Sequence, residues 1–211
     1  QKVIVLNKRG DKIPVILTVS HLSAGSAEQF IATVTDTREL LRTEQSLEAL
    51  AFTDPLTGVG NRNYLKLMLG ESVYRSAINA LVFIDLDGFK QINDQYGHEV
   101  GDEVLCECAL RLKHALREQD TLIRHGGDEF VILIQQTENL QQLGLRLLRL
   151  FKDPIQVRHL ELLVTASIGI AQSNSELSSN DLLQRADIAM YEAKKGGKNR
   201  AELYQETFNK A

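Results

Sequence analysis

The sequence predicts an α+β fold preceded by a β-meander and a connecting helix. Three observations predict this arrangement. Three β-rich segments separated by turn residues occupy the first 36 residues, and a Leu-, Glu- and Ala-rich segment without Gly or Pro follows. Beyond it, strands and helices are interspersed without a strict βαβ rhythm. We therefore expect helices flanking a mainly antiparallel central sheet.

The composition is that of a folded protein. Of 211 residues, 43% are hydrophobic and 25% are charged, which excludes disordered and low-complexity classes. The 24 Lys and Arg against 28 Asp and Glu give a net charge of −4, so no broad basic field exists and we expect no nucleic-acid partner. The apolar runs are shorter than the ~18 residues of a membrane span. We expect a cytoplasmic protein, or the cytoplasmic part of an inner-membrane protein.

The N-terminal segments predict strands over 3–7, 13–19 and 29–35, with turns at Lys8–Asp11 and Ser23–Ser26. Three strands leave one sheet face uncovered, so we interpret residues 1–36 as the end of a larger domain. Residues 37–53 form a linker whose helix spans Thr37–Phe52. A seven-residue stripe of Leu40, Leu47 and Leu50 fits a coiled coil and an amphipathic helix packed on its own chain equally well.

Residues 54–204 form the second domain, and 205–211 form a tail. Periodicity and breaker residues predict its elements in order. They are a helix capped by Asn61, a strand at Ala80–Leu86, a helix at Val100–Arg117, a strand pair around Gly126–Gly127, a helix at Leu140–Phe151, a strand at Leu162–Ile170, a helix at Asn180–Lys195 and a short strand near Ala201–Tyr204. Cys106 and Cys108 are predicted to be buried thiols without a disulfide or zinc.

Two acidic motifs indicate a cation site. Asp85 and Asp87 stand at the end of an apolar strand, where carboxylates suit a hard cation, although for this motif alone strand-end capping is the favoured explanation. An EF-hand is excluded, because Lys90 and Tyr96 stand where its glycine and glutamate belong.

The second motif, Asp128–Glu129, directly follows a Gly-Gly turn, and two such carboxylate sites could hold two divalent ions for phosphoryl transfer. No Walker-type loop is present. Phosphates would therefore be held by lysines near these motifs, namely Lys90, Lys194, Lys195 and Lys198.

Five ordered stretches resemble the GGDEF family, the diguanylate cyclases of bacterial signalling. Gly126–Phe130 spells the family signature, and Asp54–Arg62 resembles the opening motif D-x-L-T-G-L-x-N-R, with Val59 in place of Leu. Later family blocks resemble Phe83–Asp102, Val164–Ala171 and Ala186–Arg200. The resemblance implies a nucleotide-cyclase-like fold over Asp54–Tyr204. It also implies a homodimeric nucleotidyltransferase that condenses two GTP into cyclic di-GMP and two pyrophosphates.

The resemblance also implies site residues. Two Mg²⁺ or Mn²⁺ ions per site would be bound at Asp85, Leu86, Asp128 and Glu129, and catalysis would use Asp128, Glu129 and Lys90. Asn93 and Asp102 match the guanine-reading positions. A carboxylate suits this role because it can accept hydrogen bonds from both the ring N–H and the exocyclic amino group of guanine. Phe89, Lys90, Lys194 and Lys198 match positions around the triphosphate. Lys198 replaces the family's usual Arg, so a compact ammonium group replaces a planar guanidinium that can donate two parallel hydrogen bonds.

Regulation and flanking domains follow from the same resemblance. Arg117 and Asp120 stand at the spacing of the family's R-x-x-D inhibitory product site, for which Arg146 and Arg149 are candidate additional arginines. Taken alone, the pair would be an ordinary solvated helix end. Residues 1–36 resemble the end of a PAS sensor domain, and 205–211 resembles the lead-in to an EAL phosphodiesterase domain. The alternative function is a weakly catalytic GTP- or cyclic di-GMP-binding module that regulates such a phosphodiesterase.

Overall fold

A computed structural model describes residues 1–24, 27–136, 139–174 and 177–210, and divides the chain into two compact units, Gln1–Ala51 and Phe52–Ala211. The predicted turn at Ser23–Ser26 lies partly outside the described residues.

The first unit contains the predicted meander and linker helix. Strands β1 (Lys2–Leu6), β2 (Lys12–Ala24) and β3 (Ala27–Asp36) pair antiparallel in the order β1-β2-β3, and helix α1 spans Arg38–Phe52. The strand register places Val5, Val19, Phe30 and Val34 on one face, where all four side chains are exposed. Leu40, Leu47 and Leu50 of α1 are also exposed. Both the sheet and the helix of this unit therefore present apolar surface.

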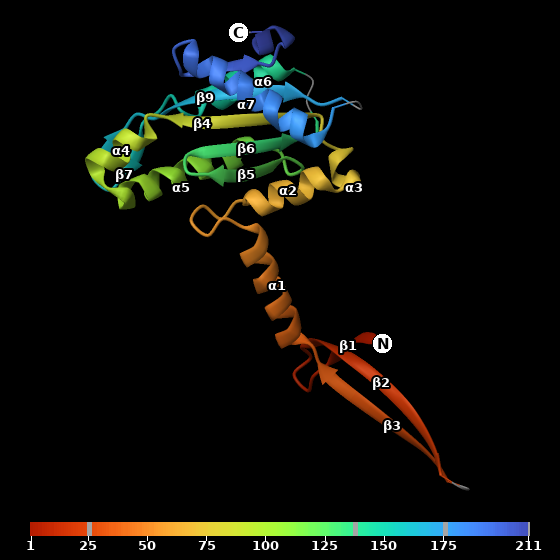
Figure 1. Ribbon diagram of the computed structural model, residues 1–211. Coiled ribbons are helices and arrows are strands. Elements are labelled where there is room, and N and C mark those ends of the chain that lie inside the picture. The colour runs from red at the N-terminus through yellow and green to blue at the C-terminus, as the bar shows by residue number, and fades with distance from the viewer. Residues whose placement is uncertain (25–26, 137–138, 175–176, 211) are drawn as a thin grey trace. The chain divides into compact units, whose positions relative to one another are not determined.

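The second unit is built on a mixed central sheet (Figure 1). Its strands lie in the order β10-β9-β4-β6-β5; β4 is antiparallel to both neighbours, and β10 is parallel to β9. The bounds are β4 Ala80–Asp87, β5 Thr121–Gly126, β6 Glu129–Ile134, β9 Thr165–Gln172 and β10 Arg200–Leu203. A separate small hairpin pairs β7 (Ile155–Val157) with β8 (Leu160–Leu162).

Helices cover both faces of this sheet. One buried cluster joins the sheet to α5 and α6, and a second joins its other face to α2 and α7. The helices are α2 Arg62–Gly70, α3 Ser72–Arg75, α4 Phe89–Tyr96, α5 His98–Ala115, α6 Leu140–Arg149 and α7 Ser179–Lys195, with a 3₁₀ turn at Glu206–Lys210. Leu81 and Phe83 of β4 point to the α7 face, whereas Val82 and Ile84 point to the α5 face.

A glycine on β9 sets how closely α7 approaches the sheet. A Cβ at Gly169 would collide with the backbone of Ala186 and Met190 on α7. The absence of a side chain at Gly169 lets the helix backbone lie directly on the strand. This close packing places the C-terminal turn of α7 over the end of β4, where the acidic residues lie.

The α+β class, the meander and the Asn61 cap are confirmed: the Asn61 side chain accepts hydrogen bonds from the backbone N–H groups of Asn63 and Tyr64. Several details of the predicted elements differ from the structure. Helix α4 was not predicted, because it is short and lies between Gly88 and Gly97. The strand predicted from Leu162 begins at Thr165, and Leu162 belongs to β8.

The predicted burial of Cys106 is also wrong. This residue is only half-buried, with its Sγ donating to the Leu56 carbonyl at 3.3 Å, whereas Cys108 is buried as predicted. Burial raises the pKa of the Cys108 thiol to about 12. Both cysteines are free.

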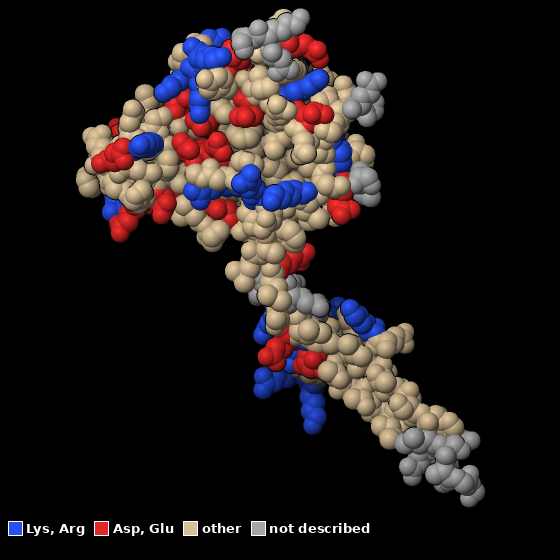
Figure 2. Space-filling model, in the orientation of Figure 1, with Lys and Arg blue, Asp and Glu red and all other residues tan. Residues whose placement is uncertain are grey.

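Charges of both signs are interspersed on the face of the second unit seen in Figure 2. Among the described residues, no helix combines the length and the apolar character needed to cross a bilayer.

Candidate active site

The candidate site begins with two carboxylates that face each other across neighbouring strands. Asp85 follows a fully buried run on β4, is itself only 8% exposed, and lies directly opposite Glu129 on β6. Side chains at opposed positions of antiparallel strands have Cβ atoms about 4.5–5.5 Å apart. Asp128 adjoins the pair, since its carbonyl accepts from the Leu86 N–H at 3.3 Å. The strand pairing therefore brings together all four predicted metal-site residues.

A lysine from α7 contacts this acidic group. The Nζ atom of Lys194 lies 2.6 Å from a carboxylate oxygen of Asp85. Lys194 is in the last turn of α7, where a cation also interacts favourably with the helix dipole. Lys198 follows in the exposed loop after α7. The structure thus joins one of the three predicted C-terminal phosphate lysines, Lys194, to the predicted metal site.

Burial and mutual repulsion disfavour the ionised forms of these carboxylates. Burial raises the pKa of Asp85, and the nearby Asp128 and Asp87 raise it further, while Lys194 opposes the shift. Burial likewise raises the pKa of Glu129, and the charges of Asp85 and Asp128 add to that effect. The positive charge of Lys194 therefore does not offset the combined effect of burial and repulsion on these carboxylates.

These residues fit a divalent cation. Carboxylate oxygens are the ligands that Mg²⁺ prefers, and a cation between Asp85 and Glu129 would relieve the repulsion that raises both pKa values. Among the described residues, no group of three or more Asp, Glu, His or Cys side chains is arranged so that it could hold a metal ion by itself. Mg²⁺ typically keeps several waters and takes further ligands from substrate phosphates. The donor set therefore suits an ion that arrives with a nucleotide.

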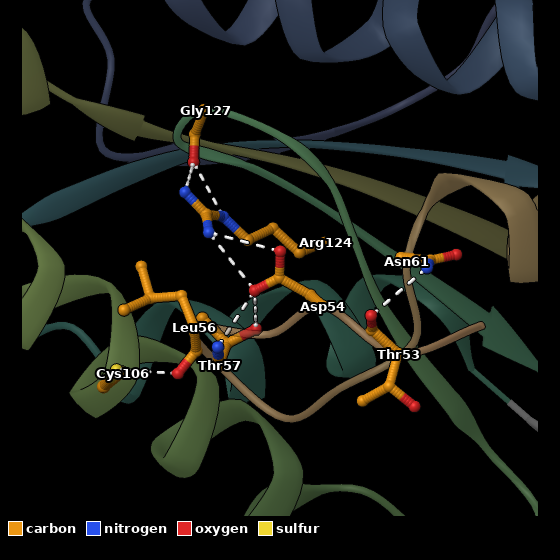
Figure 3. Close-up of polar contacts among 8 residues, drawn as sticks. All are labelled: Thr53, Asp54, Leu56, Thr57, Asn61, Cys106, Arg124 and Gly127. Carbon is orange, nitrogen blue, oxygen red and sulfur yellow. Dashed lines mark hydrogen bonds and ion pairs between the residues drawn. The ribbon is translucent and has the colours of Figure 1, made fainter. Parts of the chain in front are cut away.

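The Gly126–Gly127 turn between β5 and β6 is held by an arginine (Figure 3). Gly127 has a φ of 53°, in the left-handed region that favours glycine. The guanidinium of Arg124 donates through Nε and a terminal nitrogen to the Gly127 carbonyl, at 2.9 and 2.8 Å. His125 is half-buried, and its ring packs against that of Phe83 in a T-shaped arrangement with centroids 5.5 Å apart. Arg124 therefore fixes the turn that directly precedes Asp128 and Glu129.

The same guanidinium connects the turn to residues 70 positions earlier. Its remaining nitrogen lies 3.2 Å from a carboxylate oxygen of Asp54, and both side chains are largely buried. Asp54 also accepts from the backbone N–H and hydroxyl of Thr57, at 2.9 and 2.6 Å. Hydrogen bonds from Thr57 and Arg124 lower the pKa of Asp54 despite its burial. The opening motif of the domain and the signature turn thus form one hydrogen-bonded unit.

Helices α4 and α5 carry the predicted nucleotide-binding residues. Phe89 is buried, Lys90 and Asp102 are exposed, and Asn93 is half-buried. The Asn93 carboxamide lies against Gly101, where a Cβ would collide with its oxygen. Because Gly101 directly precedes Asp102, the structure brings the two predicted guanine-reading residues together.

The predicted inhibitory pair lies in a different place. Arg117 and Asp120 line a cavity of about 860 Å³ together with Arg146 and Arg149 of α6. Asp120 accepts from the Arg117 N–H at 3.1 Å and from the Gln135 N–H at 3.3 Å. This aspartate therefore stabilises the local turn, while three guanidinium groups surround an open polar cavity.

Sequence reasoning missed three contributors to the site. Arg124 and Asp54 were not assigned roles, because their pairing is a long-range contact without a local pattern. Gly101 was not noticed, since only packing against α4 shows why a side chain there would be disruptive.

Comparison with known proteins shows the family and the fold of this domain. Residues 51–200 match the family described as "Diguanylate cyclase, GGDEF domain". The chain belongs to this GGDEF family. Structures of the family share the fold: the coiled coil and GGDEF domain of DgcB from Caulobacter crescentus, solved in complex with c-di-GMP, matches with a TM-score of 0.67 and 27% identity, covering 79% of this chain and 94% of that one.

Two curated relatives show how this GGDEF chain compares with longer proteins. The cyclic di-GMP phosphodiesterase PdeR of Escherichia coli is 34% identical over 90% of this chain and 30% of its own length. The response regulator PleD of Caulobacter vibrioides is 40% identical over 74% of this chain and 36% of its own length. The chain thus spans about a third of these two relatives.

The raised pKa of Glu129 predicts a pH-dependent effect on stability. The folded state binds the Glu129 proton more tightly than the unfolded state, so this contribution to stability is present at low pH and is lost as pH rises through the raised pKa. In the metal-free protein, Glu129→Gln should therefore raise the thermal midpoint relative to wild type at pH 7, with the difference vanishing near pH 4.

The measurement is differential scanning calorimetry from pH 4 to 8, where ~1 kcal/mol corresponds to roughly 2–4 °C for a domain of this size. The exposed Glu118→Gln removes the same charge as a control. A pH-independent difference between Glu129→Gln and wild type would contradict the electrostatic explanation.

Proposed function

We propose that this chain is the catalytic part of a diguanylate cyclase that converts two GTP into cyclic di-GMP and two pyrophosphates. The observation that carries the proposal is the intact pair of buried Asp85 and half-buried Glu129, with Lys194 in contact with Asp85. In each half-reaction, the 3′-hydroxyl of one GTP attacks the α-phosphorus of the other, and the bond to pyrophosphate breaks.

The proposed roles follow the placement of the side chains. Asn93 and Asp102 would hold the guanine edge, with the carboxylate accepting from the ring N–H and the exocyclic amine. Lys90, Lys194 and Lys198, beside Phe89, would hold the triphosphate. Asp85, Asp128, Glu129 and the Leu86 position would hold two Mg²⁺ or Mn²⁺ ions, which supply charge neutralisation at the attacking and leaving oxygens. When these ions and phosphates bind, Lys194 would exchange its contact with Asp85 for a phosphate.

Catalysis by this scheme requires two sites that face each other, because each protomer holds one GTP. A homodimer with two-fold symmetry supplies that arrangement. The exposed stripe of Leu40, Leu47 and Leu50 on α1 supports pairing of two linker helices, since such a stripe suits a coiled coil. The exposed apolar sheet face of residues 1–36 supports an origin as the end of a PAS-like sensor domain.

We further propose that cyclic di-GMP inhibits the enzyme at the cavity lined by Arg117 and Asp120. Arg146 and Arg149 line the same cavity, so three guanidinium groups are available for two phosphates and guanine edges. The cavity is lined by residues outside the acidic site, so product would inhibit without competing with GTP.

The alternative is a regulatory GTP- or cyclic di-GMP-binding module attached to a phosphodiesterase. The match to PdeR over 90% of this chain favours it, because that protein's name describes a phosphodiesterase. The intact acidic residues favour the cyclase.

Turnover decides between these two functions. Wild type incubated with GTP and Mg²⁺ should form cyclic di-GMP, measured by chromatography and mass spectrometry, and Asp85→Asn or Glu129→Gln should reduce the rate at least about 100-fold through loss of metal-assisted charge stabilisation. Asp153→Asn, an exposed aspartate, is the matched control. Absence of product from wild type at concentrations where it is dimeric would favour the regulatory module.

Gly101→Ala should weaken GTP binding without loss of the fold. The added methyl group would displace the Asn93 carboxamide, so we expect the GTP dissociation constant to rise about tenfold, the equivalent of one lost hydrogen bond to the base. Isothermal titration calorimetry measures this, with Gly70→Ala as the control because its methyl group meets no atom within 4 Å. Equal GTP affinity in both variants would contradict the placement of Asn93.

Arg117→Ala should weaken product inhibition. Hydrogen bonds to charged groups contribute ~1.5–3 kcal/mol, so the inhibition constant for cyclic di-GMP should rise roughly ten- to a hundredfold. Progress curves with added cyclic di-GMP, each normalised to the uninhibited rate of the same variant, measure it. Equal inhibition of wild type and variant would show that the Arg117–Asp120 pair has only a structural role.

A further inference from the structure

Asp87, the last residue of β4, is held by three hydrogen bonds on the α7 face of the sheet. Its carboxylate accepts from the hydroxyls of Thr165 at 2.8 Å and Ser167 at 2.7 Å, both on β9. It also accepts from the backbone N–H of Asn199 at 3.0 Å. Alternate residues of a strand share a face, so Asp87 lies on the same side as Asp85.

The Asn199 N–H belongs to an unusual loop between α7 and β10. Lys198 and Asn199 have φ values of 63° and 46°, so two consecutive residues with a Cβ occupy the left-handed region. This conformation is unfavourable for lysine, whereas asparagine tolerates it better, so at Lys198 it persists only where other contacts enforce it. At the start of the loop, the Lys198 N–H donates to the Ala193 carbonyl of α7 at 3.0 Å. At its end, Asp87 accepts from Asn199.

The two aspartates of β4 therefore have different partners. Asp85 contacts the Lys194 side chain at 2.6 Å and faces Glu129, whereas Asp87 contacts β9 and the loop backbone. With three donors already directed at its two oxygens, Asp87 has little capacity left for a metal ion.

We propose that Asp87 is a positioning residue that fixes the left-handed Lys198–Asn199 loop, so that the Lys198 ammonium is held for the phosphates of the substrate. The proposal rests on the proposed GTP-binding function. Lysine has a flexible four-carbon stem, so a fixed backbone is the means by which the fold limits the positions of its charge.

Two substitutions at Asp87 separate positioning from metal binding. Asp87→Asn keeps an oxygen for the Asn199 N–H and an amide that can donate to Ser167, but removes the charge. It should keep the wild-type KM for GTP and the wild-type Mg²⁺ dependence. Asp87→Ala removes the acceptor and should raise the KM for GTP about tenfold, with kcat reduced less than about threefold and the Mg²⁺ dependence unchanged. A rise in the Mg²⁺ requirement of Asp87→Asn would overturn the proposal in favour of a metal ligand.

A double-mutant cycle tests whether Asp87 acts through Lys198. Because Asp87→Ala and Lys198→Ala remove the same interaction, the double variant should have a KM within about twofold of Lys198→Ala alone. Additive effects would overturn the proposal. Asp153→Ala, an exposed aspartate outside the site, is the control and should match wild type.

Hydrogen exchange of the Asn199 amide separates this inference from the proposed function, because it needs no substrate. Exchange should be at least about tenfold faster in Asp87→Ala than in wild type and near wild type in Asp87→Asn. Should Asp87→Ala not fold, Thr165→Val combined with Ser167→Ala removes two supporting donors and should accelerate the same amide. Unchanged exchange overturns the positioning role alone, whereas a wild type that binds no GTP overturns the proposed function and the substrate part of this role.

Discussion

Asp85 and Glu129 face each other across β4 and β6 at the end of a buried strand, and the rest of the site follows from that juxtaposition. Water solvates these carboxylates poorly, so their ionised forms are disfavoured, and Lys194 opposes only part of the effect. The fold supports this arrangement with close packing: Gly169 lets α7 lie directly on β9 and brings Lys194 to Asp85. A site of this kind gains most from a ligand that carries its own divalent cation.

Two further contacts hold the loops that complete the site. Arg124 connects the signature turn to Asp54 in the motif that opens the domain, so the position of Asp128 and Glu129 depends on residues far away in sequence. Asp87 similarly connects the end of β4 to the loop that carries Lys198. In both places a charged side chain binds backbone groups of a loop. Polar networks define one conformation when every member is satisfied, and these two are only partly buried.

The sequence predicted those features that have a local signal. The apolar run before Asp85, the Gly126–Gly127 turn and the Asn61 cap each carry a short pattern, and each is present in the structure. Helix α4 has only eight residues between two glycines, too short for a clear helical period. The Arg124–Asp54 and Asp87–Asn199 contacts join segments far apart in the chain, so no spacing rule could indicate them.

Mg²⁺-dependent stability tests the role of the paired carboxylates most directly. The thermal midpoint would be measured at pH 7 in the presence of a saturating non-hydrolysable GTP analogue with increasing MgCl₂, using KCl of equal ionic strength as the reference. If Asp85 and Glu129 hold a divalent cation, Mg²⁺ at ten times its Kd should stabilise wild type by about 1.4 kcal/mol and leave the Asp85→Asn/Glu129→Gln double variant unchanged. Equal stabilisation of both proteins, or none of wild type at saturating GTP analogue, would contradict the account.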